Sequence, residues 1–407
     1  MEDLVRLDRP TQAVILAGGR GTRLKPLTDT KPKPMIEIGG KPFLAYQIEQ
    51  LRSQGFEKVL LLLGYMPEVV QKYFEDGRRW DIKIEYSVSA IEDETARRVK
   101  LAEAHLEARF LLLYCDNYWP MQIDRMWSRF VAAKAPIMTT VYTNKDNYTK
   151  NNVRVDSDGY IEVYDKTGAS PRLQGVEISY TLIDKSALDL LPESNIPLEE
   201  TLFSRLAQRR QLAAYVTDHR YYSVGALNRL SLTEAFFGGK PAVILDRDGV
   251  LNRRPPRAEY VRAWADFEWL PGAKEALQLL KENGYRVAVV SNQAGVGRGV
   301  MSESDLADIH RRMLQEVKQA GGDIESIYYC PHDWDAGCQC RKPKPGLLFR
   351  AQKELHLDLT QTLFIGDDER DRQAAEAAQC RFAMVNDHDS LLTITRKVVT
   401  YDAQKQW

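Results

Sequence analysis

The chain has 407 residues, of which 44% are hydrophobic and 28% are charged, and its formal net charge at pH 7 is −1. This length favours two or three domains, and the balanced charge excludes the basic surface of a nucleic-acid-binding protein. No apolar run approaches the roughly 18 residues of a membrane helix, and the N-terminal residues lack the apolar core of a signal peptide. We therefore expect a cytoplasmic protein with small-molecule partners, no nucleic acid and no membrane. The sequence leaves the oligomeric state open, a homo-oligomer included.

A short apolar strand over residues 12–17 leads into a glycine-rich loop. Gly18, Gly19 and Gly21 let the backbone approach a ligand closely, and Arg23 follows in the same loop. Free backbone N–H groups beside basic side chains make an anion site, for which a triphosphate is the natural ligand. A plain tight turn is the alternative for a glycine-rich loop taken alone.

With the Lys31-Pro32-Lys33-Pro34 segment that follows, this loop resembles the signature of the sugar-phosphate nucleotidyltransferases. Those enzymes have a Rossmann-like sheet and join a nucleoside triphosphate to a sugar 1-phosphate, releasing pyrophosphate. The resemblance extends to about residue 238. It implies that the three glycines and Arg23 hold the triphosphate, and that Lys33 neutralises charge as the sugar phosphate attacks the α-phosphorus. A solvated loop lysine is the alternative for Lys33.

Alternating strands and helices follow, with strands expected at residues 58–64 and 110–114. The second strand leads to Asp116, and an aspartate at such a strand end can hold Mg²⁺ against phosphates. The resemblance gives Asp116 this role. It also matches Asp165 and Lys166 to an acidic–lysine pair that contacts the sugar, with Asp where Glu is more usual.

Two segments depart from the family pattern. Residues 94–98 read Glu-Thr-Ala-Arg-Arg where the family has a turn like Gly-Thr-Gly-Gly-Ala, so Arg97 puts a side chain where bare backbone is expected. Ser223 stands where an aspartate is the usual second metal ligand, and serine is a poor substitute for a carboxylate. Either the metal arrangement is modified, or this half has lost catalysis and kept a binding or structural role.

Apolar residues at helical spacing over 227–237 end at a Gly-Gly-Lys-Pro segment, and a new strand-turn-helix unit begins at Ala242. We therefore expect two domains, residues 1–238 and 239–407. The fold class predicted for both is α/β, Rossmann-like, with mainly parallel sheets.

The apolar strand over residues 242–245 ends in two carboxylates, Asp246 and Asp248, followed by a glycine turn. The carboxyl edge of a parallel sheet is where α/β proteins place their chemistry. One carboxylate can attack phosphorus while the second handles the proton of the leaving group. A surface turn or a calcium loop is the alternative for this pattern taken alone.

Three polar residues downstream fit the same chemistry. Ser291 follows a predicted strand and can hydrogen-bond a phosphoryl oxygen. Lys342 precedes a helix and would offset the negative charge of crowded carboxylates and phosphate. Asp367 ends another strand and can complete a Mg²⁺ shell with Asp246 and the backbone carbonyl of Asp248.

Asp-x-Asp, Ser, Lys and Gly-Asp-Asp in this order on successive strand ends resembles the haloacid dehalogenase phosphatase superfamily. The resemblance implies that Asp246 attacks phosphorus to form an aspartyl-phosphate. Asp248 would protonate the departing sugar oxygen and later activate water. Mg²⁺ is expected because an anionic nucleophile must approach an anionic phosphate.

Three thiols and one imidazole lie close together in the sequence, at Cys330, His332, Cys338 and Cys340. This set has the composition of a closed tetrahedral Zn²⁺ site of the structural type. Buried free cysteines are the alternative. Because the segment runs into Arg341 and Lys342, we expect zinc to position these basic residues.

The cysteine segment, with residues 246–252 and 291–299, resembles a narrower group: the D-glycero-D-manno-heptose 1,7-bisphosphate 7-phosphatases and the related histidinol-phosphate phosphatases. This resemblance implies that Asn292, Arg298 and Arg341 bind the substrate; as solvated surface residues the two arginines would have no role. The short segment between the histidine and the second cysteine leaves both substrates open.

The combination of the two halves favours heptose. Removal of the 7-phosphate leaves heptose 1-phosphate, the kind of compound that a nucleotidyltransferase activates, whereas histidinol phosphate offers the first domain nothing. We predict a bifunctional enzyme that makes a nucleotide-activated heptose for surface carbohydrate such as lipopolysaccharide, with GTP as the expected donor by family analogy. The alternatives are a phosphatase with an inactive, nucleotide-sugar-binding N-terminal domain, and a scaffold role for both halves.

Overall fold

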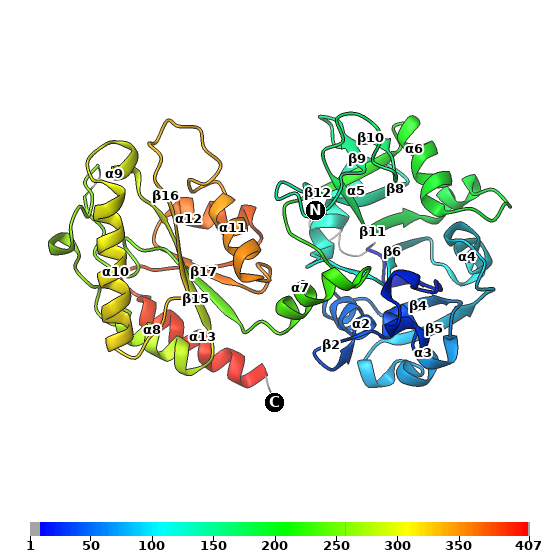
Figure 1. The fold of residues 1–407 in the computed structure, drawn as a ribbon, viewed down its shortest axis with the longest axis horizontal. Coiled ribbons are helices and arrows are strands. Elements are labelled where there is room, and N and C mark those ends of the chain that lie inside the picture. The colour runs from blue at the N-terminus through cyan, green and yellow to red at the C-terminus, as the bar shows by residue number, and fades with distance from the viewer. Residues whose placement is uncertain (1–8, 257, 406–407) are drawn as a thin grey trace. The chain divides into compact units, whose positions relative to one another are not determined.

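The computed structural model describes residues 9–256 and 258–405, and the chain divides into two compact units, Met1–Phe237 (unit 1) and Gly238–Trp407 (unit 2). Each unit is an α/β domain built on a mainly parallel sheet, as the sequence predicts (Figure 1). Within the described ranges, no helix is both long and apolar enough to cross a membrane.

Unit 1 is built on a seven-stranded sheet in the order β12-β8-β11-β6-β1-β4-β5. β11 runs antiparallel to both of its neighbours, and the other neighbouring pairs are parallel. The strands are β1 (Gln12–Ala17), β4 (Lys58–Leu63), β5 (Lys83–Val88), β6 (Arg109–Tyr114), β8 (Ile137–Tyr142), β11 (Val176–Asp184) and β12 (Leu212–Thr217). The α-helices are α2 (Phe43–Ser53), α3 (Pro67–Phe74), α4 (Thr95–Leu101), α5 (Ile123–Ala133), α6 (Ser204–Gln208) and α7 (Leu227–Phe237).

Short strand pairs complete this unit. They are β2 (Glu37–Ile38) with β3 (Lys41–Pro42), β9 (Val153–Val155) with β10 (Ile161–Tyr164), and β7 (Asn117–Tyr118) with β13 (Tyr222–Ser223). The last pair matters for the site, because it places Ser223 directly opposite Asn117, next to Asp116.

The central strand β1 shows why the sheet lies between two layers. All six of its residues are buried, and successive side chains point to opposite faces. Ile15 packs into one hydrophobic cluster and Val14 into another, on the other side of the sheet. A strand covered on both faces reads as a continuous apolar run, as this one does.

Unit 2 contains a five-stranded, fully parallel sheet in the order β16-β15-β14-β17-β18. The central strand β14 therefore has β15 and β17 as neighbours, and the carboxyl ends of all three lie at one edge. The strands are β14 (Ala242–Leu245), β15 (Arg286–Asn292), β16 (Ser326–Cys330), β17 (Leu363–Gly366) and β18 (Arg381–Met384). The α-helices are α8 (Ala273–Glu282), α9 (Ala294–Gly297), α10 (Glu303–Gln319), α11 (Gly346–Leu355), α12 (Glu369–Ala377) and α13 (Leu391–Lys405).

Helix α10 has a clear start signal and a clear buried stripe. Ser302 accepts a hydrogen bond from the backbone N–H of Asp305, whose carboxylate accepts one from the backbone N–H of Ser302. This reciprocal cap satisfies two free donors of the first turn. The helix then buries one face through Leu306, Ile309, His310, Met313 and Val317, so a histidine lies among its apolar contacts.

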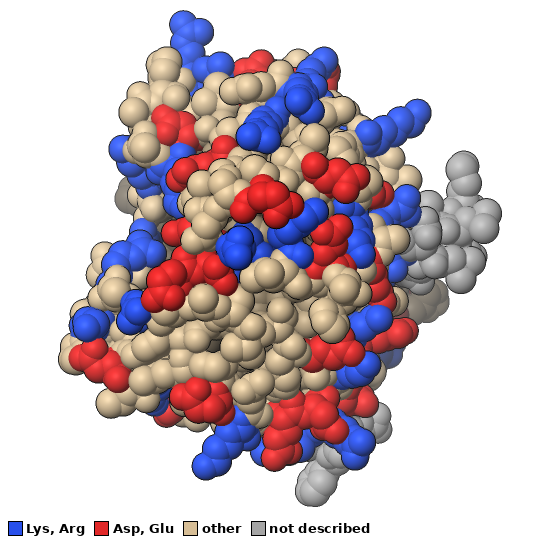
Figure 2. Space-filling view, turned by 90° about the vertical axis from the view of Figure 1, so that its right-hand side faces the viewer, with Lys and Arg blue, Asp and Glu red and all other residues tan. Residues whose placement is uncertain are grey.

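The surface carries charges of both signs. Figure 2 shows a face on which Lys and Arg side chains intermingle with Asp and Glu. This pattern agrees with the net charge of −1.

Helix α7 is anchored by an aromatic stack that can be tested directly. Phe236 is 8% exposed and stacks on Tyr222, with ring centroids 3.8 Å apart. We expect Phe236→Ala to lower the free energy of unfolding of unit 1 by about 3 kcal/mol, because it removes a large buried side chain. Leu227→Ala, at a position that is 49% exposed on the same helix, should change it by less than about 0.5 kcal/mol. Urea denaturation followed by circular dichroism measures both, and equal losses would contradict the anchoring of α7 through Phe236.

Candidate functional site

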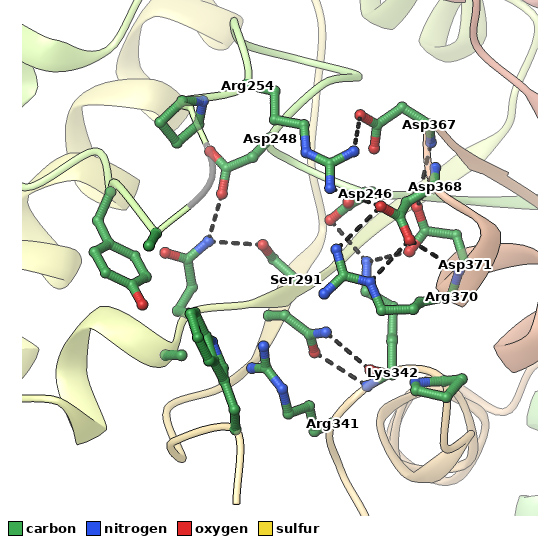
Figure 3. Close-up of a pocket in the computed structure, with 18 of the residues that line it drawn as sticks. Asp246, Asp248, Arg254, Ser291, Arg341, Lys342, Asp367, Asp368, Arg370 and Asp371 are labelled. Carbon is green, nitrogen blue, oxygen red and sulfur yellow. Dashed lines mark hydrogen bonds and ion pairs between the residues drawn. The ribbon is translucent and has the colours of Figure 1, made fainter.

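A cavity of about 800 Å³ opens at the carboxyl edge of the sheet of unit 2. Its lining brings together five residues that the sequence singles out: Asp246, Asp248, Ser291, Lys342 and Asp367. Asp246 follows β14, Ser291 is the second-last residue of β15, and Asp367 follows β17, so the parallel sheet itself brings them together. Figure 3 shows their side chains converging from separate segments of the chain.

Lys342 is the charged centre of this cavity. Its Nζ atom lies 2.8 Å from Asp246 Oδ1 and 2.7 Å from Asp371 Oδ1, and it donates to the carbonyl of Val290 at 2.9 Å (Figure 3). Burial alone would lower the pKa of Lys342, but the two carboxylates outweigh it and raise that pKa. Burial raises the pKa of Asp246 to about 7 although Lys342 opposes the shift. The carboxylate of Asp246 is thus held beside a fixed cation.

Three carboxylates form a group with the chemistry of a magnesium site. One oxygen each of Asp246, Asp367 and Asp371 lies within 4.8 Å of the others. Asp367 Oδ1 is buried and has no hydrogen-bond partner among the described residues. Carboxylate oxygens are the ligands that Mg²⁺ prefers, so these residues fit that ion. The Asp248 side chain lies outside the group, and its predicted contribution through the backbone carbonyl stays a prediction.

Sequence reasoning missed Asp371. It lies four residues after Asp367, in the first turn of α12. Its Oδ2 atom accepts the backbone N–H groups of Asp367 and Asp368, both at 3.2 Å. An acidic residue one turn after a strand-end aspartate was the available signal.

Two glycines make room for these carboxylates. A Cβ atom at Gly249, whose φ is +99°, would lie 2.0 Å from Asp367 Oδ2. A Cβ atom at Gly366 would lie 2.4 Å from Asp371 Cβ. Any side chain at either glycine would therefore collide with the neighbouring aspartate.

Asp248 has a different environment from Asp246. Arg247 Nη2 donates to both of its oxygens at 3.0 Å, Asn252 Nδ2 to Oδ1 at 2.9 Å and Gln293 Nε2 to Oδ2 at 2.8 Å. Burial would raise the pKa of Asp248, but Arg247 and the two amides lower it. Asp248 is thus an ionised, firmly oriented carboxylate before substrate arrives. Sequence reasoning gave no role to these three donors.

Two of the three predicted substrate-binding residues of unit 2 lie at the cavity, and the third does not. Asn292 and Arg341 line the cavity. Arg298 is not part of that lining: it pairs with Asp333 at 3.3 Å and lies over the ring of Trp334, 4.4 Å from its centroid. Trp334 does line the cavity, so Arg298 reaches the site only through its contact with this ring.

Two further arginines at the cavity were not anticipated. Arg254 Nη1 lies 3.0 Å from Asp367 Oδ2, and its Nη2 lies 2.6 Å from Asp368 Oδ2 (Figure 3). Arg370 Nε lies 2.8 Å from Asp368 Oδ1. With Lys342 and Arg341, they give the acidic edge a set of cations able to meet phosphate oxygens.

The cysteine segment folds back on itself beside the cavity. The ligand atoms of Cys330, His332, Cys338 and Cys340 all lie within 4.8 Å of one another, and His332 Nδ1 is 3.2 Å from Cys340 Sγ. Although burial opposes ionisation, the backbone N–H of Arg341 and the neighbouring thiols lower the pKa of Cys338 to about 7. A set of three sulfurs and one ring nitrogen at this spacing fits a tetrahedral metal ion.

A second cavity, of about 300 Å³, lies at the glycine-rich loop of unit 1. It brings together five predicted residues, Gly19, Gly21, Arg23, Lys33 and Asp116. Lys33 forms an ion pair with Asp116. Burial would lower the pKa of Lys33, but Asp116 outweighs it and raises that pKa, so the lysine is charged.

Arg98, not Arg97, is the side chain that enters this region. Arg97 points outward and pairs with Asp93 at 3.0 Å, so the expectation that it intrudes is wrong. Arg98 is buried and donates to the carbonyls of Leu63, Ala90 and Ile91 and to the hydroxyl of Ser89. A Cβ atom at Gly18 would lie 2.4 Å from its Nη1, so Gly18 is the residue against which Arg98 packs.

Ser223 is used structurally. Its hydroxyl donates to the backbone carbonyl of Asp116 at 2.9 Å and accepts the backbone N–H of Gly225 at 3.0 Å. The side chain therefore fixes the strand end that carries Asp116. It adds no carboxylate to the cavity.

The predicted sugar-binding pair lies outside the lining of this cavity. Asp165 accepts hydrogen bonds from the backbone N–H groups of Thr167 and Ser170 in its own turn, and Lys166 is exposed. Sequence reasoning also missed Glu177, a half-buried acid near this pair whose pKa is raised by burial to about 7.

Residues 173–379 match the family of haloacid dehalogenase-like hydrolases, and residues 12–165 match the nucleotidyl transferase family. The chain belongs to the haloacid dehalogenase-like hydrolases. The acidic site of this hydrolase lies wholly in unit 2, whereas residues 173–237 of the match fold with unit 1. The nucleotidyl transferase match lies wholly in unit 1, so the hydrolase carries a second enzymatic domain.

Curated relatives resemble unit 2 of this hydrolase. It is 41% identical over 148 residues to the D-glycero-beta-D-manno-heptose-1,7-bisphosphate 7-phosphatase of Photorhabdus laumondii, covering 35% of this chain and 77% of the relative. It is 37% identical over 173 residues to the enzyme of the same name from Pasteurella multocida, covering 41% and 89%.

Unit 1 resembles a solved structure in fold. That structure is a putative glucose-1-phosphate thymidylyltransferase from Bacillus anthracis in complex with a sucrose. The identity is 19%, the TM-score is 0.50, and the match covers 55% of this chain and 94% of the other. At this identity the likeness shows the fold alone.

The buried charge of Lys342 gives a stability prediction. Lys342→Gln leaves Asp246 and Asp371 without their cation, and we expect the free energy of unfolding of unit 2 to fall by about 3 kcal/mol at pH 8. Because the loss of the cation raises the folded-state pKa of Asp246 further above that of the unfolded chain, the destabilisation should shrink as the pH falls. Denaturation in the presence of a chelator measures both effects.

Lys344→Gln is the matched control, since Lys344 Nζ only donates to the carbonyl of Gly337 near the surface. It should change stability by less than about 1 kcal/mol at either pH. A Lys342 variant as stable as this control would show that the buried ion pairs contribute nothing.

Proposed function

We propose that unit 2 removes the 7-phosphate of D-glycero-D-manno-heptose 1,7-bisphosphate, and that unit 1 transfers a nucleotidyl group from a nucleoside triphosphate to the resulting heptose 1-phosphate. The observation that carries the proposal is the arrangement of Asp246, which lines a cavity, pairs with Lys342 and lies close to Asp367 and Asp371. The names of the relatives of unit 2 supply the substrate.

In the phosphatase reaction Asp246 attacks the phosphorus of the 7-phosphate. A bond forms between the Asp246 carboxylate and phosphorus, and the bond from phosphorus to the sugar oxygen breaks. Ser291 and Lys342 bind the phosphoryl oxygens, and Arg341 and Asn292 hold the rest of the substrate. Bound Mg²⁺ would supply charge neutralisation between the anionic nucleophile and the phosphate, with Asp246, Asp367 and Asp371 as its ligands.

Asp248 handles the proton in both half-reactions. It must gain a proton before it can donate one to the departing sugar oxygen, and the arriving phosphate favours this because added negative charge raises the pKa of a carboxylate. After the sugar has left, the ionised Asp248 takes a proton from water as that water attacks the aspartyl-phosphate. Inorganic phosphate and free Asp246 result.

In unit 1 the glycine-rich loop and Arg23 bind the triphosphate, and Lys33 neutralises charge at the α-phosphorus. Asp116 is the carboxylate that would hold Mg²⁺, and Asp165 and Lys166 remain the proposed sugar contacts. GTP is the proposed donor because the family resemblance favours guanylyl transfer. Dephosphorylation comes first, because the second reaction consumes a sugar 1-phosphate.

We propose Zn²⁺ as the ion of the cysteine segment. Its three thiols and one imidazole are soft and borderline donors at tetrahedral spacing, and Arg341 and Lys342 follow directly. Zinc would act by fixing the loop that leads to these two cations, not by touching substrate.

The two activities can be separated by substitution. The purified chain is incubated with Mg²⁺, α- or β-heptose 1,7-bisphosphate and each nucleoside triphosphate in turn, and products are followed by mass spectrometry. The unmodified chain should give a nucleotide-heptose. Asp246→Asn should lower the rate of phosphate release at least about 1000-fold. The variant should still convert added heptose 1-phosphate, since it lacks only the nucleophile of unit 2. Lys33→Gln should accumulate heptose 1-phosphate.

Each other outcome identifies a different function. Heptose 1-phosphate without nucleotide-heptose would favour a unit 1 that binds nucleotide but does not transfer it, a candidate supported by Ser223 and by the buried Arg98. Hydrolysis of histidinol phosphate, with heptose bisphosphate left intact, would contradict the proposed substrate.

The zinc assignment has its own test. Cys338→Ser should lower the zinc content from about one ion per chain to near zero, because serine is a poor zinc ligand. Cys380→Ser, outside the cysteine cluster, should retain the metal. Metal analysis by mass spectrometry distinguishes the two, and equal zinc contents would refute the site.

A further inference from the structure

A buried histidine on α10 reaches the general acid through one arginine. His310 Nε2 lies 3.2 Å from Arg247 Nη1, and Arg247 Nη2 in turn donates to both oxygens of Asp248. His310 is 8% exposed and Arg247 is 0% exposed, so water does not replace either contact. The chain of contacts joins a helix of unit 2 to the reacting groups.

We infer that His310 is a positioning residue of the phosphatase reaction: by accepting from Arg247, it holds the guanidinium in the plane that orients Asp248 toward the leaving oxygen. This inference rests on the phosphatase function proposed above. Neither the sequence patterns nor the named relatives give His310 a role.

The direction of the hydrogen bond follows from the chemistry of the two side chains. A guanidinium only donates, so Nε2 of His310 must carry no proton and act as the acceptor. Burial and the charge of Arg247 lower the pKa of His310 to about 3, which keeps the ring neutral throughout the physiological range. The ring of Tyr329, with its centroid 5.7 Å away on β16, packs against the same histidine.

Arg247 is held at every edge of its planar group. Its Nε and Nη2 atoms donate to Asp248, its Nη2 also donates to Gln293 Oε1 at 3.1 Å, and its Nη1 meets His310. Gln293 Nε2 completes this hydrogen-bond network by donating to Asp248 Oδ2 and to the Ser291 hydroxyl, both at 2.8 Å. Removal of the histidine acceptor leaves a wholly buried donor unsatisfied, and the guanidinium must turn to find another partner. Turning it breaks the paired contact with Asp248.

The leaving group of the substrate provides the readout. A sugar oxygen needs a proton from Asp248 as it departs, whereas p-nitrophenolate leaves without one. We expect His310→Phe to lower kcat/KM for heptose 1,7-bisphosphate about tenfold, a fraction of the full value of a general acid. It should lower kcat/KM for p-nitrophenyl phosphate less than about twofold. His310→Gln, whose amide oxygen can accept from Arg247, should restore most of the loss.

A matched control separates positioning from general destabilisation. Ile309→Ala truncates the fully buried side chain next to His310 on the same helix, and an isoleucine side chain forms no hydrogen bond with Arg247. This variant should lower the melting temperature at least as much as His310→Phe. It should leave the ratio of the two kcat/KM values unchanged. Full-length protein with Mg²⁺ is used throughout.

The outcomes are distinct. Equal losses on both substrates in His310→Phe, or a ratio that Ile309→Ala changes as much, would overturn the positioning role. No rescue by His310→Gln would overturn the acceptor argument. Failure of the unmodified chain to hydrolyse either phosphate ester would instead refute the proposed phosphatase function.

Discussion

The structure of unit 2 depends on one buried lysine between two carboxylates. In the proposed reaction Asp246 must be shielded from water yet remain able to ionise, and these two demands conflict, since burial raises the pKa of a carboxyl group. Lys342 resolves the conflict at Asp246 by placing a cation 2.8 Å away. The same cation lies 2.7 Å from Asp371, which in turn caps the start of α12 through backbone N–H groups. The charge of Lys342 therefore stabilises both Asp246, at the end of β14, and Asp371, at the start of α12.

Asp246 and Asp248 belong to one short motif but lie in opposite environments. Extended residues two apart would face the same way, but the chain bends at Arg247, between the two aspartates, and the Asp248 side chain meets a separate set of donors. Burial makes Asp246 harder to ionise, while Arg247 and two amides make Asp248 easier to ionise. Pairs of acids whose pKa values are pushed apart in this way mark a division of roles. The neutral His310 behind Arg247 belongs to this division, because it keeps the charge of the arginine directed at only one of the two acids.

The sequence predicted the strand-end residues well, because their placement follows from local patterns alone. An apolar run followed by Asp246, Ser291 or Asp367 fixes the carboxyl edge of a parallel sheet wherever the rest of the chain goes. Arg254, Arg247 and His310 could not be predicted in the same way: each has its partner through tertiary packing, and His310 reads as one more residue in a helical stripe. Arg98 shows the same limit, since the motif comparison pointed to Arg97 and only the helix phase of α4 decides which arginine turns inward. Sequence patterns indicate which helices and strands form, whereas the contacts of long side chains depend on how these elements pack.

The two cavities also differ in charge, and the difference follows from their chemistry. The cavity of unit 2 balances several acids against several cations, which agrees with the proposal that one of its own carboxylates is the nucleophile. The charged residues that line the cavity of unit 1 are Arg23, Lys33, Arg98 and Asp116, three cations and one acid. Such a lining attracts a polyanion whose attacking group comes from a second substrate and not from the protein. Because Ser223 supplies no second carboxylate, Asp116 is the one carboxylate of this lining that could hold a metal ion. The charge of the lining agrees with the triphosphate proposed as its ligand.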